Sequence, residues 1–412
     1  MKARGVSLAV LAAVLGASAG RARADDEVGV DDVIAMYREH APRVAAARAQ
    51  IDVTAADRVE ATIYPNPTLS FGGLRTVQGE PTSGRNQFSA GLDVPVLIGH
   101  QRARRGDAAA ARIEVTRRGV AVDEASAEVS IREKFLALQG AQQRTATLAA
   151  AVEDAIRARA VVTGRVAAGA SSPYALERVE LAVATASSKV DEARADERAH
   201  AAELAAAIGR AGWIPHARTT LADDEAAAPA APAATPAGIA PDHPLLALAQ
   251  AEAVAARAEA SRAEADAVPT PSVGLTAFST TGPEGLALLL GVSVPLATSD
   301  RNQGQIARAH AQEQAARLET EADRAELAAQ RTGAMAVLAL RREALARYRA
   351  DMLARLPKVR EMAESAYRSG QGGIVELLDA IDAITEAKLR EVDLLAAVAE
   401  AELAVRTATT GR

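Results

Sequence analysis

The stretch Leu92-Asp93-Val94-Pro95-Val96 decides the fold, because a closely similar stretch, Val292-Ser293-Val294-Pro295-Leu296, occurs 200 residues further along the chain. A second pair of matched segments lies at almost the same separation. Arg165-Val166-Ala167-Ala168-Gly169 corresponds to Ala366-Tyr367-Arg368-Ser369-Gly370. This interval is far longer than the period of any solenoid repeat. The chain is therefore predicted to contain two copies of one domain-sized unit.

Each copy is predicted to contain one β-hairpin that ends at the repeated proline. Apolar side chains alternate with small or polar ones in both stretches, which is the period of a β-strand. The predicted hairpins span about 68–95 and about 272–295. Their strands are close in length to the roughly 9 to 11 residues that a tilted strand needs to cross a bilayer. The small and polar side chains expected on the inward face are those of Ser89, Gly91, Gly274, Thr276 and Ser293.

A soluble β-subdomain is the alternative interpretation of the hairpins. Aromatic residues make up only 2% of the chain, whereas membrane barrels usually carry aromatic girdles at both interfaces.

Very long helices are predicted after both hairpins, over 101–163 and 301–369, with no proline before Pro357. A heptad seam supports the second of them. It is formed by Leu338, Leu345, Met352 and Val359. A returning helix in each half carries the same kind of seam. An ordinary coiled-coil dimer would explain these helices but not the hairpins.

The ends and the middle of the chain give its organisation. Residues 1–24 have the charged, apolar and small-residue parts of a signal peptide. The first repeat is expected over 25–212 and the second over 242–412, each as helix, hairpin, long helix and returning helix. An Ala/Pro-rich linker is expected over 213–241, where four prolines from Pro229 onward would prevent a regular helix.

The composition excludes several classes of function. The absence of cysteine excludes disulfides, thiolate metal sites and a lipidated cysteine, and the net charge of −6 argues against nucleic acid as a partner. The six histidines have no metal-ligand spacing. No catalytic, cofactor-binding or metal-binding residue is therefore expected, and the chain is not predicted to be an enzyme.

Four strands cannot close a barrel, yet an open sheet edge is not tolerated in lipid. Several copies must therefore share one barrel. Two copies would give eight strands and a filled interior, whereas three copies would give twelve strands and leave a lumen. A homotrimer in contact with outer-membrane lipid is the preferred interpretation.

Two further segments carry a family resemblance. Residues 64–69, Tyr-Pro-Asn-Pro-Thr-Leu, and residues 300–304, Asp-Arg-Asn-Gln-Gly after Pro295-Leu296, resemble the entry into the first strand and the exit from the last strand in the TolC family of outer-membrane efflux proteins. The likeness is strongest to the heavy-metal branch, which serves cobalt-zinc-cadmium and copper-silver pumps. The chain departs from the family in lacking an acylated N-terminal cysteine.

The resemblance implies a mainly α chain with a membrane β-barrel. Three copies would form a twelve-stranded barrel in the outer membrane, continued through the periplasm by a long α-helical coiled-coil barrel. The implied function is a passive exit duct, for heavy-metal cations or other exported substrates. Its partners would be a periplasmic adaptor and an inner-membrane transporter of the resistance-nodulation-division type. The alternatives are a periplasmic adaptor or a coiled-coil scaffold of the envelope.

The resemblance also places two candidate sites. The glycine turns around Gly169 and Gly370 would be the periplasmic tips that contact the adaptor. Glu376 and Asp379 resemble the acids that ring the family's periplasmic constriction, and their spacing puts them on one helical face. The first half has Ala175 at the position of Glu376. The alternative role of these acids is to favour the start of their helix through its dipole.

Overall fold

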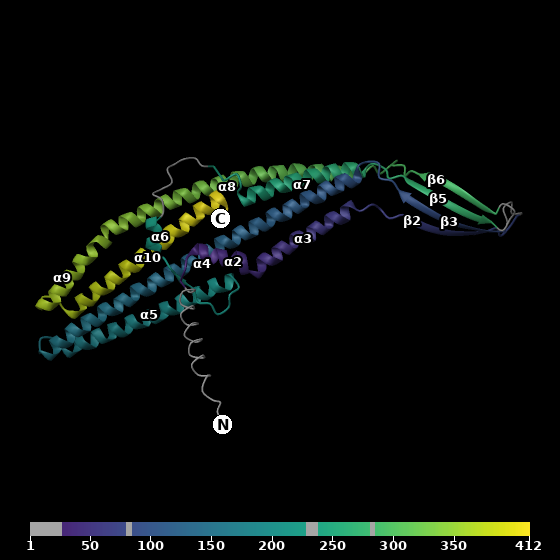
Figure 1. Ribbon diagram of the computed structural model, residues 1–412. Helices are drawn as coiled ribbons and strands as arrows, with labels where there is room; N and C mark the ends of the chain where they lie inside the picture. The colour runs from purple at the N-terminus through teal and green to yellow at the C-terminus, as the bar shows by residue number, and fades with distance from the viewer. Residues whose placement is uncertain (1–26, 80–84, 228–237, 281–284) are drawn as a thin grey trace, which may run out of the picture. The chain divides into compact units, whose positions relative to one another are not determined.

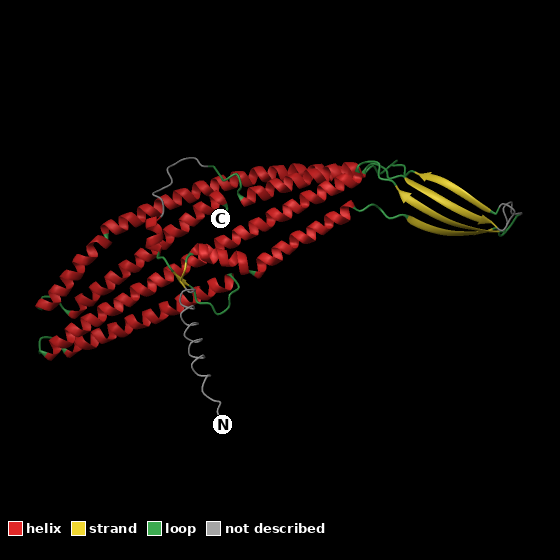
Figure 2. Cartoon of the chain, in the orientation of Figure 1, coloured by secondary structure: helices red, strands yellow, loops and turns green. Residues whose placement is uncertain are grey.

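The computed structural model describes residues 27–79, 85–227, 238–280 and 285–412, and these are mostly helical (Figures 1 and 2). The predicted signal peptide and the proline-rich part of the predicted linker lie outside the described residues. In the first half the elements are β1 Glu27–Val28, α2 Val30–His40, α3 Pro42–Thr62, β2 Thr68–Arg75, β3 Asn86–Pro95, α4 Gln101–Ala167 and α5 Pro173–Ala207. They are followed by β4 His216–Ala217, α6 Leu221–Ala227, α7 Pro244–Asp266, β5 Ser272–Thr280, β6 Leu286–Ser293, α8 Gln303–Asp351, the short 3₁₀ helix η1 Leu353–Arg355, α9 Leu356–Ser369 and α10 Ile374–Thr410.

The chain divides into two compact units, each assembled from distant parts of the sequence. The sheet unit comprises the described residues of Ala46–Asp123 and Pro241–Glu326. The helical unit comprises the described residues of Met1–Ala45, Glu124–Ala240 and Leu327–Arg412. Each unit therefore draws on both predicted repeats, and α4 and α8 each contribute residues to both units.

The two hairpins of the sheet unit join into one antiparallel sheet with the order β2-β3-β5-β6. Residues directly opposite each other in such a sheet place their side chains on the same face. Leu92, for example, lies opposite Leu69 and Leu275. The resulting face is apolar and exposed, and its large members are Leu69, Phe71, Phe88, Leu92, Val94, Val273, Leu275, Leu286, Leu288, Leu290 and Val292.

The opposite face of the sheet carries the small and polar side chains that the sequence places on the inward face. Gly91 lies between Ser70 and Thr276 on this face. A Cβ at Gly91 would lie 2.9 Å from the hydroxyl oxygen of each neighbour, so a larger residue would displace both hydroxyls. Leu74, Phe278 and Leu289 are apolar residues on the same face.

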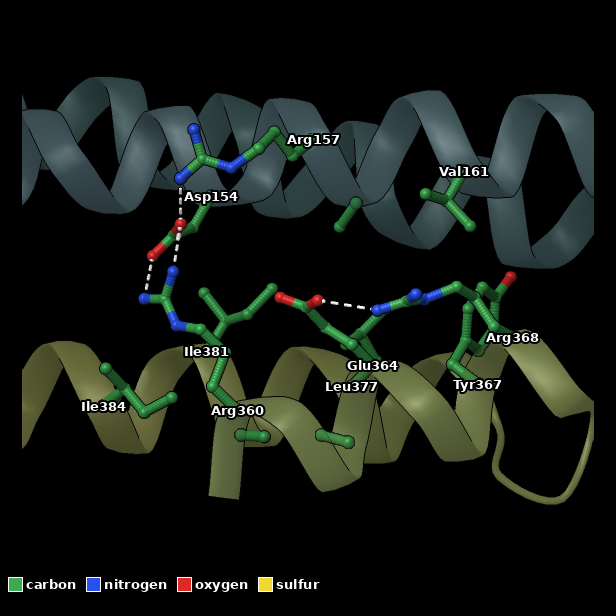
Figure 3. Close-up of a pocket in the computed structure, with 13 residues that line it drawn as sticks. Asp154, Arg157, Val161, Arg360, Glu364, Tyr367, Arg368, Leu377, Ile381 and Ile384 are labelled. Carbon is green, nitrogen blue, oxygen red and sulfur yellow. Dashed lines mark hydrogen bonds and ion pairs between the residues drawn. The ribbon is translucent and has the colours of Figure 1, made fainter. Parts of the chain in front are cut away.

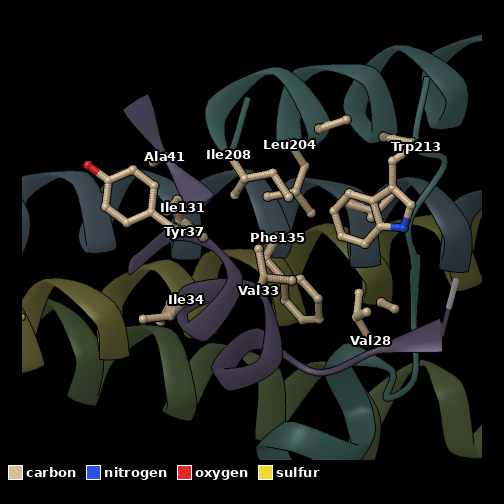
Figure 4. Close-up of a cluster of buried hydrophobic side chains, with 14 of the residues drawn as sticks. Val28, Val33, Ile34, Tyr37, Ala41, Ile131, Phe135, Leu204, Ile208 and Trp213 are labelled. Carbon is tan, nitrogen blue, oxygen red and sulfur yellow. The ribbon is translucent and has the colours of Figure 1, made fainter. Parts of the chain in front are cut away.

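The helical unit has its largest core where α2, α4 and the end of α5 meet (Figure 4). Val33 and Leu204 are fully buried there, and Phe135 and Trp213 complete the cluster. The guanidinium of Arg210 lies 5.4 Å from the centre of the Trp213 ring. Because Trp213 belongs to this core, the predicted linker starts inside ordered structure.

The prediction that the linker contains no regular helix is wrong for its first part, which forms α6. The N-terminus of α6 is capped reciprocally: the Thr220 hydroxyl accepts the Asp223 N–H at 3.2 Å, and the Asp223 carboxylate accepts the Thr220 N–H at 3.0 Å. Leu221 is buried against Leu338, Leu345 and other apolar side chains of the helical unit. Capping and burial therefore form a helix ahead of the prolines.

The second long helix is not continuous as predicted, because it breaks between α8 and α9. Pro357 lies in the first turn of α9. It has no N–H to donate, and its ring would clash with the carbonyl four residues earlier in a continuous helix. The heptad seam fails at the same place, since Leu345 is buried but Met352 and Val359 are exposed in the single chain. The first long helix, α4, extends four residues beyond its expected end and closes at Ala167.

None of the described helices is both long and apolar enough to cross a membrane.

Candidate functional site

The two predicted tip turns have the same backbone geometry. Gly169 and Gly370 have φ angles of +70° and +77°, a left-handed conformation that glycine adopts without the steric cost of a side chain. After α4, the Ala170 N–H donates to Arg165 O and the Gly169 N–H donates to Val166 O. The equivalent two bonds close α9 around Gly370. Both helices therefore end in a Schellman motif.

Arg165 ties the two turns together. Its guanidinium donates to the carbonyl oxygens of Tyr367 and Arg368 at the end of α9, and to Ala170 O in its own turn. It also lies over the Tyr367 ring, 4.9 Å from the centroid. One side chain thus donates to carbonyls from both halves of the chain, at helix ends whose last carbonyls have no partner within the helix.

An apolar cluster lies between the helices that meet at these turns. Val162 of α4, Val179 of α5 and Tyr367 of α9 are buried together with Leu377 and Leu378 of α10. The four helix ends of the two repeats are therefore packed as one body near the turns.

A polar clamp lies beside this cluster and lines a pocket of about 320 Å³ between α4, α9 and α10 (Figure 3). Arg360 of α9 binds both carboxylate oxygens of Asp154, which also accepts a hydrogen bond from Arg157. Burial alone would raise the pKa of Asp154, but the hydrogen bonds from Arg360 and Arg157 outweigh burial and lower its pKa below the ordinary value. The clamp therefore favours the charged carboxylate.

The Asp154 clamp predicts a loss of stability in acid. An aspartate whose pKa is lower in the folded chain than in the unfolded chain stabilises the fold above the unfolded value, about 3.9, and this stability is lost as the pH falls through the folded value. Asp154→Asn should lower stability near neutral pH by about 1–3 kcal/mol, between the values for exposed and buried pairs. Thermal unfolding followed by circular dichroism from neutral pH to about pH 2 should show a smaller acid-induced drop for Asp154→Asn than for the parent. An equal loss of stability in acid for the parent and Asp154→Asn would show that the Asp154 clamp does not cause it.

The two predicted gate acids lie at the start of α10, and both are exposed. The Glu376 carboxylate accepts the backbone N–H of Gly373, so this residue also caps its helix. No hydrogen bond or ion pair is found for the Asp379 side chain among the described residues. Asp382 and Glu386 continue the exposed line of acids along α10. Their spacing of three and four residues was visible in the sequence, but the prediction did not include them.

Within the described ranges, no group of three or more His, Asp or Glu side chains is arranged to hold a metal ion. The described residues therefore form a sheet with one exposed apolar face, two glycine turns joined by Arg165, and a line of exposed acids on α10. Such a duplicated hairpin-and-helix chain has the architecture expected of an outer-membrane channel protein.

Comparison with known proteins shows which family the chain resembles. Residues 243–411 match the family model described as outer membrane efflux protein. Over 361 residues the chain is 24% identical to the cobalt-zinc-cadmium resistance protein CzcC of Cupriavidus metallidurans, a match that covers 85% of this chain and 82% of that protein. The chain is therefore similar to TolC-like outer-membrane efflux proteins, a family whose members are channels.

Two solved structures show the same fold. Crystal structures of CusC match with a TM-score of 0.74 at 17% identity, covering 94% of this chain and 93% of that chain. The outer membrane protein VceC of Vibrio cholerae matches with a TM-score of 0.71 at 14% identity, covering 92% and 96%. The TolC-like fold class predicted from the sequence is confirmed.

Proposed function

We propose that three copies of this chain form the exit duct of a tripartite efflux system, with one twelve-stranded barrel in the outer membrane. The single observation that carries this proposal is the sheet. Its outer strands, β2 and β6, each pair on one side only within the described chain, and its apolar face is exposed. Unpaired strand edges are costly in lipid, so copies that pair β2 with β6 would satisfy the edges while the apolar faces contact lipid.

The helical part would extend into the periplasm, with the two glycine turns as the end that contacts an adaptor. Both turns are closed at the backbone and joined by Arg165, which presents them as one preformed surface. A preformed surface binds with a smaller loss of conformational entropy than a mobile one. The adaptor would connect the duct to an inner-membrane transporter of the resistance-nodulation-division type.

Metal cations are the proposed cargo. The relative from Cupriavidus metallidurans is named for resistance to cobalt, zinc and cadmium. In a trimer, Glu376 and Asp379 would each form a ring of three acids at the periplasmic constriction, and Asp382 and Glu386 would extend the acidic lining. Rings of carboxylates attract cations in cation channels. The cargo would pass through without a resident metal site.

Substitution of the second tip glycine tests the docking part of the proposal. Gly370→Val should lose most adaptor capture in a pull-down, because valine resists the positive φ angle of this turn at a cost of about 1–2 kcal/mol. Gly164→Ala is a suitable control, because Gly164 lies near the end of α4, is not among the glycines with positive φ, and a Cβ there would meet no atom within 4 Å. Trimer amounts in the outer-membrane fraction should be normal for both variants. Normal capture by Gly370→Val would contradict docking at this turn, whereas loss of the protein itself would assign the glycine to folding alone.

A further inference from the structure

A groove lined by arginines lies in the sheet unit, between the start of α4, the end of α7 and the start of α8. It has a volume of about 620 Å³. Five arginines line it against three carboxylates. These residues are Arg105, Arg112, Arg262, Arg301 and Arg308, with Glu259, Asp266 and Asp300.

Three of the arginines share the two α7 carboxylates that line the groove. Asp266 binds Arg105 at 2.8 Å and Arg262 at 3.5 Å. Glu259 binds Arg112 at 2.6 Å and Arg262 at 3.1 Å. Each guanidinium carries five N–H donors and each carboxylate has about four acceptor sites. This arrangement leaves N–H donors without a carboxylate acceptor.

The remaining two arginines form no ion pair among the described residues. Within the described ranges, the Arg301 guanidinium donates only to the backbone oxygen of Ala297, at 3.3 Å. Both Arg301 and Arg308 are exposed. Asp300, the third carboxylate of the groove, accepts the backbone N–H of Asn302. The groove therefore carries positive charge that the described part of the chain does not neutralise.

The chemistry of the groove selects a phosphate group. Planar guanidinium groups bind phosphate oxygens through paired N–H bonds, and several of them together can surround one phosphate. The first turns of α4 and α8 contain no acidic residue that would repel such an anion.

The position of the groove indicates which phosphate it binds. The loops that lead from the sheet to α4 and α8 also expose large apolar side chains, since Ile98 is 58% exposed and Leu296 is 80% exposed. Arg301 follows Leu296 by five residues. Basic pockets at the boundary of an apolar membrane surface bind phospholipid head groups.

We propose that this groove binds the phosphate of an anionic phospholipid at the periplasmic boundary of the outer membrane. The inference rests on the proposed function only in placing the apolar face of the sheet in lipid. The bound head group would fix the depth of the sheet in the bilayer.

Lipid binding to the purified full chain tests the proposal. Native mass spectrometry in detergent would count bound dioleoylphosphatidylglycerol as this lipid is titrated. The double variant Arg301→Gln and Arg308→Gln should bind it at least about tenfold more weakly, because charge-assisted hydrogen bonds are lost. Arg308→Lys should bind with intermediate strength, since an ammonium keeps the charge but not the planar pair of donors. Arg324→Gln, an exposed arginine of α8 outside the groove, should bind as the parent does.

Unchanged lipid binding by the double variant would overturn the proposal. Complete displacement of the lipid by millimolar inorganic phosphate would assign the groove to free anions and would overturn it too. Circular dichroism melting should be the same for parent and double variant, because neither arginine forms an ion pair. Planar-bilayer recordings separate this inference from the proposed function: conducting channels formed by the double variant would show that only the lipid site was lost, whereas a parent that never conducts would contradict the duct itself.

Discussion

Channels that carry Glu376→Gln together with Asp379→Asn are expected to lose most of their preference for cations over anions in single-channel recordings. Block by divalent cations should weaken at the same time. Each trimer would lose two rings of three negative charges, and acidic rings are what concentrate cations at a narrow pore. Gln at 376 can still accept the Gly373 N–H through its side-chain carbonyl, so the substitution removes the charge and keeps the cap.

The two single variants, Glu376→Gln and Asp379→Asn, separate the contribution of charge to ion selectivity from that of helix capping. Asp379→Asn should have the larger effect on ion selectivity, because the Asp379 carboxylate is exposed and forms no hydrogen bond among the described residues. Glu192→Gln with Asp196→Asn is a matched control, since it removes the same charge from exposed positions on α5. Selectivity and block unchanged from the parent in the α10 double variant would leave only the helix-starting role for these acids.

The second large effect is expected from Arg165→Ala. The variant loses hydrogen bonds to the carbonyls of Tyr367, Arg368 and Ala170 and the stacking on the Tyr367 ring. A charge-assisted hydrogen bond contributes about 1.5–3 kcal/mol to stability when it is buried, and less at a partly exposed site. We therefore expect Arg165→Ala to destabilise the closed turns by about 2–4 kcal/mol in total. Local opening of the turns should rise by roughly 30-fold or more, because 1.4 kcal/mol corresponds to a factor of ten.

Limited proteolysis measures this opening. Cleavage within 166–172 and 368–373 should accelerate by tens of fold in Arg165→Ala, because proteolysis follows the population of the open form. Arg159→Ala is the matched control, since Arg159 lies on the same helix and, among the residues that the structure describes, its side chain pairs only with Glu180 of α5, at 3.5 Å. If the two variants are cleaved at equal rates, Arg165 does not hold the two turns together.

The hairpins and the glycine turns could be predicted because their signals are local. Alternation with a period of two places the strands, and the positive φ of Gly169 and Gly370 requires a residue type that is visible in the sequence. Helix α6 was missed because the alanine and proline composition of its surroundings outweighed a four-residue capping pattern that begins at Thr220.

Interactions between distant segments could not be predicted. Arg360 and Asp154 are 206 residues apart, and Arg165 and Tyr367 are 202 residues apart. Only the packed fold brings them together, and both arginines look like solvated helix residues in the sequence. The failure of the heptad seam after Leu345 has a local origin instead, since Met352 follows the repeat but lies at the break before Pro357.

Disulfide trapping between the two outer strands tests the shared barrel most directly. The chain has no cysteine, so Ser70→Cys on β2 can be combined in turn with Ala287→Cys, Leu289→Cys or Gly291→Cys on β6. Within one chain β2 and β6 are separated by two other strands, a distance of about 14 Å at 4.8 Å per strand, which is too far for a disulfide. Oxidation of outer membranes should therefore yield covalent trimers for at least one combination. Protein that is present in the outer-membrane fraction but stays monomeric with all three combinations would contradict the account.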